Sequence, residues 1–335
     1  MSNKKPFFKS IRGIIVLMIL LVAFAFLSLR MGSASLNGPA FWGGLLGLDG
    51  FSTESTILFS IRLPRMIAAV LAGAGLSVSG VLLQSVTGND LAGPNIIGVN
   101  AGAGFSIILL MFFFPDAVYL FPLVSFCGAF FTTLLIVSIS AGINRSKSTV
   151  VLAGVAVTAI LNAGISFLSL LNPDVLVSYS YFSVGGLSGV MTNELIGPAF
   201  MILPCIFLSV FLSRRIDTLC LGDSIAVSLG VNVGRLRILS LMIASACAAA
   251  VVSFAGLLGF VGLIVPHMAK KLVGQGMIFL VPVSALLGAI LVLAADLLGR
   301  TLFSPTELPV GIVMALIGAP FFFWLLIRQK RGELC

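Results

Sequence analysis

The sequence predicts an all-α, polytopic membrane protein with about ten transmembrane helices. Hydrophobic residues make up 59% of its 335 residues and charged residues only 9%, whereas soluble proteins average about 45–50% and about 25%. The apolar residues lie in long runs, of the length that a helix needs to cross a bilayer. We therefore expect residues 1–335 to form one transmembrane domain.

The basic residues predict how these helices are oriented. Four of the 19 Lys and Arg residues, Arg30, Arg62, Arg65 and Arg300, fall on one side of the predicted spans. The other fifteen fall on the opposite side, which the positive-inside rule makes cytoplasmic. This asymmetry accounts for the formal charge of +8, so we expect no nucleic-acid partner. The fifteen are Lys4, Lys5, Lys9, Arg12, Arg145, Lys147, Arg214, Arg215, Arg235, Arg237, Lys270, Lys271, Arg328, Lys330 and Arg331.

The first predicted span, residues 13–29, follows a basic tail of residues 1–12. A signal peptide is the competing interpretation, but the run is longer than a usual signal-peptide core and more spans follow. The eighth span is the weakest, because it is short and carries Pro266 and His267. Including it gives ten spans and places both tails, 1–12 and 329–335, in the cytoplasm. The later spans are expected near 66–86, 95–114, 118–141, 149–171, 195–213, 238–256, 258–272, 277–298 and 309–328.

The second span and the turn after it are rich in small residues. Ala69, Gly73 and Ser77 recur every four residues, with Gly80 near the next turn, a pattern that lets helix backbones approach closely in a membrane. The turn that follows is either a tight connection or an irregular segment that lines a pathway. Neither region contains a GxxxxGK[ST] nucleotide loop. The candidates for packing or pathway are Gly73, Ser77, Gly80, Gln84, Asn89, Pro94 and Gly98.

The longest polar interruption, residues 214–237, lies on the predicted cytoplasmic side. Asp223 is expected to cap a short amphipathic helix that runs to about Leu229, with Gly230 as its stop. Such a helix either rests on the lipid headgroups or inserts into a groove of a cytosolic partner.

The predicted outer surface consists of residues 31–65, 172–194 and 299–308. Arg62, Arg65 and Arg300 each lie at a helix boundary there. They are either anchors whose side chains reach the membrane–water interface or cations that bind carboxylates of an outside partner. Asp296 and Arg300 are four residues apart and are expected to pair on their helix.

The sequence offers no energy source of its own. All eleven acidic residues fall in loops or near span ends, whereas ion-driven carriers usually keep a coupling group near the midplane. The single His267 is a poor metal or catalytic site, and the five cysteines form no CxxC pair. We therefore predict no catalytic residues, no metal and no directly bound cofactor, with the ATPase on a separate chain.

Eight stretches in order carry a resemblance to the FecCD-type permeases, the membrane subunits of ATP-binding-cassette (ABC) importers for iron–siderophore complexes, haem and cobalamin. The chain differs from the usual family pattern at Asp90, where Pro is common, at Lys270, where Arg is common, and at YFSVGGL (181–187), where WxxGSL is common. The eight stretches are RLPR (62–65), LAGAGLSVSGVLLQ (71–84), NDLAGPNIIGVNAGAG (89–104), LAGVAV (152–157), LGDSIAVSLGVNV (221–233), GFVGLIVPHMAK (259–270), ADLLGR (295–300) and ELPVGIVMALIGAPFFFWLL (307–326).

The resemblance implies a type II ABC importer permease in the cytoplasmic membrane of a bacterium. A second permease, identical or homologous, would share the pathway, two ATPase subunits would hydrolyse ATP below it, and an extracytoplasmic substrate-binding protein would dock above it. Docking is implied for Arg62, Arg65 and Arg300, and a cytoplasmic interface for Pro266 and His267. ATPase coupling is implied for Leu221, Gly222, Asp223, Ala226, Leu229, Gly230 and Val231.

The cargo that this resemblance favours is an iron(III)–siderophore complex. The alternatives are the same architecture carrying cobalamin or haem, an ion-coupled secondary carrier, and a scaffold without transport activity. The iron–siderophore importer and the cobalamin or haem importer differ in substrate alone. In a secondary carrier, uptake would depend on an ion gradient and not on ATP.

Overall fold

The computed structural model describes residues 11–32, 37–48, 50–143, 147–302 and 306–330, and these residues form helices and connecting segments without a β-strand. The all-α prediction is confirmed. The α-helices are α1 (Ile11–Arg30), α2 (Gly38–Leu46), α3 (Ser52–Thr56), α4 (Leu63–Thr87), α5 (Val99–Phe113), α6 (Phe121–Ile143), α7 (Lys147–Leu171), α8 (Pro173–Val184), α9 (Thr192–Phe211), α10 (Ser213–Cys220), α11 (Asp223–Ser228), α12 (Val233–Ala255), α13 (Val261–Val273), α14 (Met277–Thr301) and α15 (Val310–Lys330).

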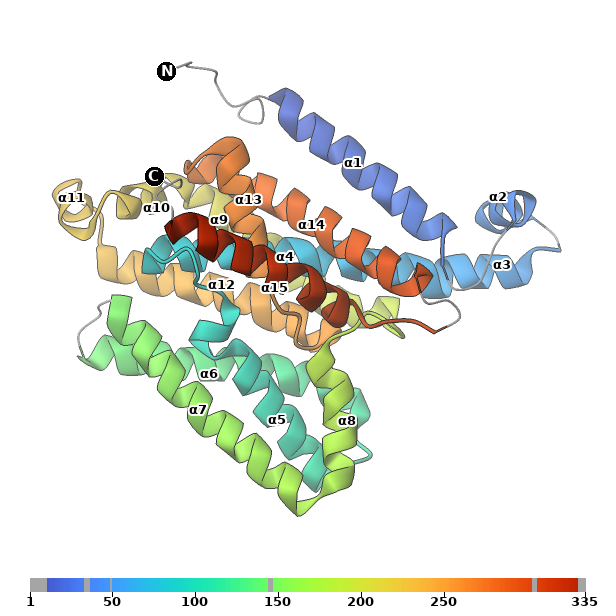
Figure 1. Ribbon diagram of the computed structural model, residues 1–335, viewed down its shortest axis with the longest axis horizontal. Helices are drawn as coiled ribbons and strands as arrows, with labels where there is room; N and C mark the ends of the chain where they lie inside the picture. Colours follow the sequence, from blue (N-terminus) through green and yellow to red (C-terminus); the bar gives the residue numbers. More distant parts are fainter. Residues whose placement is uncertain (1–10, 33–36, 49, 144–146, 303–305, 331–335) are drawn as a thin grey trace.

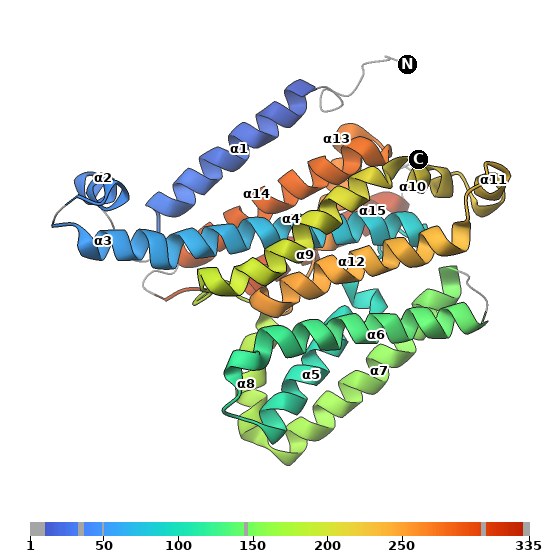
Figure 2. The same cartoon turned by 180° about the vertical axis from the view of Figure 1, so that it is seen from behind.

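Helix α4 lies at the centre of the molecule, where it packs against α12, α13 and α14 (Figure 1). Helix α1 packs against α14. Helices α5 to α8 form a second group, which contacts the central helices where α6 packs against α12 (Figure 2). In Figure 1, α1 runs toward the end of the molecule that carries α2 and α3, and α15 runs toward the end that carries α11. We call this the inner end, following the charge-based prediction, and the end that carries α2 and α3 the outer end.

Seven helical segments of the described chain are long and apolar enough to cross a membrane. Two shorter apolar helices, Val99–Phe113 and Val310–Trp324, fall where spans are predicted, as does α13 with 13 residues. The exact number of ten therefore stays a prediction. The seven segments are Gly13–Arg30, Ser52–Thr87, Val118–Ser140, Thr149–Leu171, Thr192–Phe211, Val233–Ala255 and Met277–Thr301.

The predicted start of the second span is too late. Helical structure is continuous over the 36 residues Ser52–Thr87 and includes a π-helical segment, Ile57–Arg62, directly before α4. Pro64 at the start of α4 has no N–H to donate to the preceding turn, which fits a local change of hydrogen-bond pattern there. The outer segment 31–65, expected only as a surface connection, thus adds α2, α3 and an extension of α4.

The small residues of α4 allow its close contacts with two neighbours. A Cβ atom on Gly73 would overlap the carbonyl oxygen of Gly288 in α14, and one on Gly80 would overlap that of Gly262 in α13. Ser77 lies on the same stripe and donates a hydrogen bond of 2.6 Å to the carbonyl oxygen of Gly73. These residues therefore serve helix packing within the chain.

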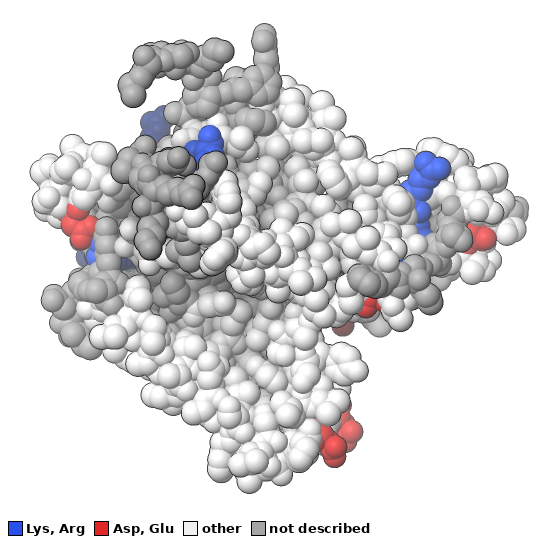
Figure 3. All heavy atoms as spheres, viewed as in Figure 1, with Lys and Arg blue, Asp and Glu red and all other residues white. Residues whose placement is uncertain are grey.

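Charged side chains of the described residues gather at the margins of the face shown in Figure 3, and its centre is uncharged. The exposed residues of the long helices are mostly large and apolar, as on α7, where Leu152, Ile160 and Leu170 are 72%, 71% and 80% exposed. An apolar belt with charged margins is the surface that a lipid bilayer covers.

Candidate functional site

At the outer end, five charged residues form one cluster, which we call the outer arginine cluster: Arg62, Arg65, Asp296, Arg300 and Glu307. Arg65 lies at its centre. Its Nε donates to both carboxylate oxygens of Asp296, at 2.9 and 3.2 Å, and its Nη1 donates to Oε2 of Glu307 at 2.6 Å. The pair predicted from spacing is also present, since Nε of Arg300 lies 3.5 Å from Oδ2 of Asp296.

The other two arginines of the cluster hold the outer end of α1. Nη2 of Arg300 donates to both the carbonyl oxygen and the hydroxyl of Ser28, at 2.8 and 2.5 Å. Nη1 of Arg62 donates to the carbonyl oxygens of Leu29 and Arg30, at 2.7 and 2.8 Å. These last carbonyl groups of a helix have no partner inside it, so the two arginines act as its C-terminal cap.

Burial corrects one expectation about these arginines. Arg62, Arg65 and Arg300 are only 3%, 7% and 2% exposed, so they are neither interfacial anchors nor free surface cations. Their guanidinium groups are hydrogen-bonded inside the chain, as a buried charge requires to be stable. Docking through them stays a prediction, and it now requires an exchange of partners instead of the capture of a free cation.

At the inner end, the predicted short helix is present as α11, and Gly230, with φ of 78°, lies two residues beyond its last residue, Ser228. The expected cap is wrong, however: Gly222 precedes the helix, and Asp223 is its first residue. The Asp223 carboxylate instead accepts two hydrogen bonds of 2.9 Å from Nη2 of Arg237, a buried residue of α12. This ion pair ties the start of α11 to a membrane helix.

The surface of α11 and its flanks is apolar and exposed. Leu221, Ile225, Val227 and Leu229 are 61%, 47%, 62% and 59% exposed, whereas Ala226 is buried against the rest of the chain. Four large apolar side chains on one short segment at the polar end of a membrane protein indicate a surface that something covers. Both sequence-based interpretations, a headgroup contact and a partner groove, fit this geometry.

A third group of charged residues joins the inner ends of α4 and α13. Nζ of Lys270 donates to Oδ1 of Asp90 at 2.5 Å and to Oε1 of the buried Gln84 at 2.9 Å. Asp90 and Lys270 are two of the three departures from the usual family pattern, and the structure brings them into direct contact.

The remaining candidates of this region have separate surroundings. Asn89 accepts a hydrogen bond of 2.9 Å from the Leu91 amide and shapes the turn. Pro94 begins a 3₁₀ segment, Pro94–Ile97, and lines a cavity of about 140 Å³ together with Asn95 and Phe260. Gly98 follows with a φ of 72°, which only glycine adopts readily. Irregular backbone at membrane depth is tolerated where it lines such a cavity.

Pro266 is buried in α13, and the ring of His267 packs edge to face on Phe321 with centroids 6.2 Å apart. Its Nε2 is buried without a hydrogen-bond partner among the described residues. The described residues contain no group of three or more His, Cys, Asp or Glu side chains that could hold a metal ion.

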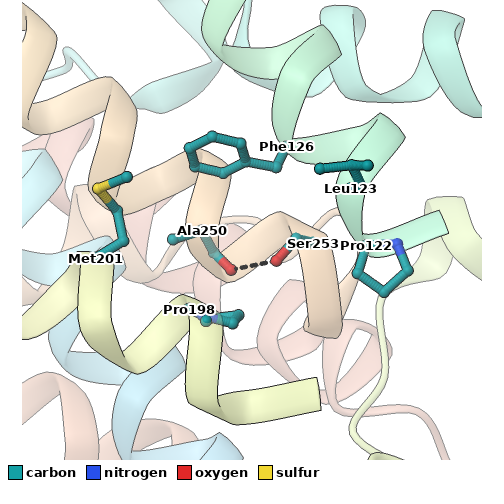
Figure 4. A pocket seen from close by; sticks show the side chains of 8 residues that line it. Pro122, Leu123, Phe126, Pro198, Met201, Ala250 and Ser253 are labelled. Atoms are coloured by element: carbon teal, nitrogen blue, oxygen red, sulfur yellow. Dashed lines mark hydrogen bonds between the residues drawn. The ribbon is translucent and has the colours of Figure 1, made fainter. Parts of the chain in front are cut away.

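An apolar pocket of about 320 Å³ lies between α6, α9 and α12. Figure 4 shows Phe126, Met201 and Pro198 around it, and the hydroxyl of Ser253 donating to the Ala250 carbonyl oxygen of its own helix at 2.7 Å. None of its eight described lining residues is charged. Its one polar side chain, Ser253, already donates to its own helix, and no charged group is present to bind a metal chelate, so we assign the pocket no role in substrate recognition.

Several functional residues escaped sequence analysis. Glu307 and Ser28 belong to the outer arginine cluster and its cap, but nothing in their local sequence shows that they contact these arginines; Ser28 and Arg300, for example, are 272 residues apart. Asp296 alone had a signal, its spacing of four from Arg300. Arg237 had been counted only as a basic residue of the cytoplasmic side.

Comparisons with known proteins show the family of this chain. The model of the FecCD transport family matches residues 19–328. The Fe(3+)-citrate import system permease protein YfmE of Bacillus subtilis is 36% identical over 99% of this chain and 98% of its own length. The hemin transport system permease protein HmuU of Yersinia pestis is 35% identical over 94% and 95%. The achromobactin transport system permease protein CbrC of Dickeya dadantii is 36% identical over 94% and 90%.

A solved structure, described as an inward-facing conformation of a metal-chelate type ABC transporter, superposes with a TM-score of 0.85 at 31% identity and covers 95% of this chain and 99% of that one. The match extends over nearly the whole fold. The chain therefore belongs to the FecCD transport family, as a membrane-spanning permease subunit of an ABC transporter and not an enzyme.

Proposed function

We propose that this chain is the permease of an ATP-driven importer that moves an iron(III)–siderophore complex across the cytoplasmic membrane of a bacterium, with both termini in the cytoplasm. The relatives named above are permeases for iron citrate, hemin and achromobactin, so metal chelates are the shared cargo class. The observation that carries the proposal within the structure is the exposed apolar surface of α11 at the inner end.

One of the two ATPase subunits would bind this surface in the helix-in-groove manner, with Ile225, Val227 and Leu229 as anchors, and the other would bind the second permease. Closure of the ATPase dimer on ATP would then move α11. The Asp223–Arg237 ion pair would pass that movement to α12, because an element bound to a rigid helix cannot move alone. Gly222 and Gly230 would bound the moving unit.

A second permease, identical or homologous, would complete the pathway along the interface between the two. An extracytoplasmic substrate-binding protein would deliver the cargo at the outer end. Asp296 supports an external energy source: it is buried, but two arginines already hold it, so it is not available as the exchanging group that an ion-coupled carrier needs.

The test is uptake of radiolabelled iron–siderophore complexes of hydroxamate, catecholate and citrate types in cells that lack this chain. We expect loss of one siderophore class, restored by the gene and abolished when ATP is depleted. Uptake that persists without ATP but collapses with the ion gradient would contradict the importer. The hemin permease at 35% identity supports a second cargo, haem, so labelled haem and cobalamin are measured alongside. Loss of haem or cobalamin uptake, with intact iron–siderophore uptake, would change the assigned cargo but not the assignment as an importer.

A further inference from the structure

Arg65 is held by two carboxylates that differ sharply in exposure. The Asp296 side chain is 1% exposed and lies between Arg65 and Arg300, whereas the Glu307 side chain is 27% exposed and contacts Arg65 alone of the two. Removing a buried carboxylate from between two arginines leaves charges without compensation. Glu307, in contrast, can be hydrated when it leaves. Of the two acids, Glu307 is therefore the exchangeable one.

The surroundings of Glu307 allow its side chain to move while its main chain stays. The amide of the next residue, Leu308, donates a hydrogen bond of 2.9 Å to the carbonyl oxygen of Gly299 and fixes the backbone. Besides Arg65, Oε2 of Glu307 accepts a hydrogen bond of 3.3 Å from the exposed Ser188. The longer, exposed contact is the weaker of the two.

The charges of the outer arginine cluster do not balance. Its three arginines face two carboxylates, Asp296 and Glu307, so the five side chains carry an excess of one positive charge. If Glu307 turns away into solvent, the excess grows around Arg65. An approaching carboxylate is then attracted to the position that Glu307 has left, because Nη1 of Arg65 has lost its acceptor and Arg65 shares its one remaining carboxylate, Asp296, with Arg300.

We propose that Glu307 is a placeholder, which occupies Arg65 until a carboxylate of the docking protein replaces it. This inference rests on the proposed docking of a substrate-binding protein at the outer arginine cluster. It assigns that partner an acidic contact residue opposite Glu307. It also links docking to the membrane domain. Glu307 lies three residues before α15. The amide of Gly311, the second residue of α15, donates a hydrogen bond to the turn after α8.

The test compares docking to the assembled transporter in nanodiscs before and after Glu307→Gln. The probe is the substrate-binding protein whose deletion gives the same uptake defect as deletion of this chain. The variant keeps the shape of the side chain but lacks the charge that competes for Arg65. We therefore expect docking to tighten by about threefold to tenfold at low salt. Asp174→Asn, at the exposed start of α8, removes the same charge elsewhere on the outer side and is expected to leave docking nearly unchanged.

Docking of Glu307→Gln that equals or falls below that of the wild-type protein, at normal yield of assembled transporter, would overturn the exchange. Should that variant assemble poorly, Ser188→Ala decides instead. It removes the second hydrogen bond of Glu307 from an exposed position, and we expect docking to tighten by about twofold. Unchanged or weaker docking of Ser188→Ala would count against the proposal.

The docking assignment itself is tested separately. If arginines receive the partner, docking of the wild-type protein weakens as salt rises, and Arg65→Lys, which keeps the charge but loses the forked geometry, weakens it further. Docking that ignores both salt and Arg65→Lys would contradict the assignment, whatever Glu307→Gln does. Reversal of Arg62 or Arg65 to Glu is less informative, because it places a new carboxylate in a buried site and endangers folding.

Discussion

The two ends of this permease present opposite kinds of surface. At the outer end, three arginines and two carboxylates are drawn together inside the chain, and the arginines are at most 7% exposed. At the inner end, four apolar side chains on and around α11 are 47–62% exposed, and one ion pair, Asp223–Arg237, lies beneath them. Charged groups are buried at the outer end, where polar contacts are expected, and apolar groups are exposed at the inner end, where water is expected.

This difference indicates two kinds of partnership. Exposed apolar surface is stable only when it is covered most of the time, so the inner end is built for a lasting contact with an ATPase or the headgroups. A charge cluster whose members are hydrogen-bonded within the chain is stable without a partner, so the outer end suits a contact that forms and breaks in each cycle. Mutations at the outer end should therefore affect folding first, and those at the inner end should affect coupling first.

The largest effect is expected from Asp296→Ala. The change leaves Arg65 and Arg300 without the carboxylate between them, and loss of one member of a buried ion pair costs about 3–5 kcal/mol. We expect the variant to lose most of its folded, monodisperse protein in mild detergent, with a lower unfolding temperature for the remainder. Asp174→Ala, an exposed carboxylate of the same side, serves as control and should behave as wild type. Full stability of Asp296→Ala would show that the cluster does not hold the outer end together.

The next effect is expected from Gly230→Val at the inner end. A Cβ there would meet no other atom within 4 Å, so the only cost comes from the φ of 78°. For a residue other than glycine this conformation costs about 1–2 kcal/mol, enough to change the turn that ends α11. We expect uptake to be lost while the amount of protein in the membrane stays normal.

The matched control for Gly230→Val is Gly47→Val. Gly47 ends α2 at the outer end with a φ of 65°, and a Cβ there would also meet no other atom within 4 Å. The two variants carry the same backbone strain at opposite ends. Equal loss of uptake in both would mean that strain itself, and not its place beside α11, is responsible.

The sequence predicted the helices better than it predicted their contacts. Apolar runs of membrane-spanning length and the glycines of α4 are local signals, and the structure has helices and close packing at those places. The extension of α4 back to Ser52 was missed, because a polar STEST segment does not look like part of a membrane helix. The outer arginine cluster was recognised as three basic residues but not as a buried network, since Glu307 is 242 residues from Arg65 and only the fold brings them together.

A smaller effect on stability is expected from Asp223→Asn. Asp223 is half exposed, with 50% of its side chain accessible, whereas its partner Arg237 is buried. Asn at position 223 keeps an oxygen that can accept from Nη2 of Arg237, so the buried guanidinium keeps a hydrogen bond and we expect a loss of at most about 1 kcal/mol. Yield and unfolding temperature should therefore match those of the wild-type protein, in contrast to Asp296→Ala. ATP hydrolysis of the reconstituted complex should continue with less transport per ATP, because α11 is less firmly tied to α12. A variant that transports normally would show that this ion pair does not transmit the movement.

The smallest effect is expected from Asp90→Ala, which breaks the ion pair between the two departures from the family pattern. Asp90 is 55% exposed, and Lys270 keeps its hydrogen bond to Gln84, so we expect a loss of at most about 1 kcal/mol. Gln84→Ala should cost more, because it leaves the Lys270 ammonium with an exposed partner only and opens space in a buried site. Both losses of stability can be measured as shifts in the unfolding temperature of the purified permease. If Asp90→Ala proves the more damaging, the turn after α4 depends on this ion pair, and the inner end combines its exposed apolar surface with a second, structural charge contact.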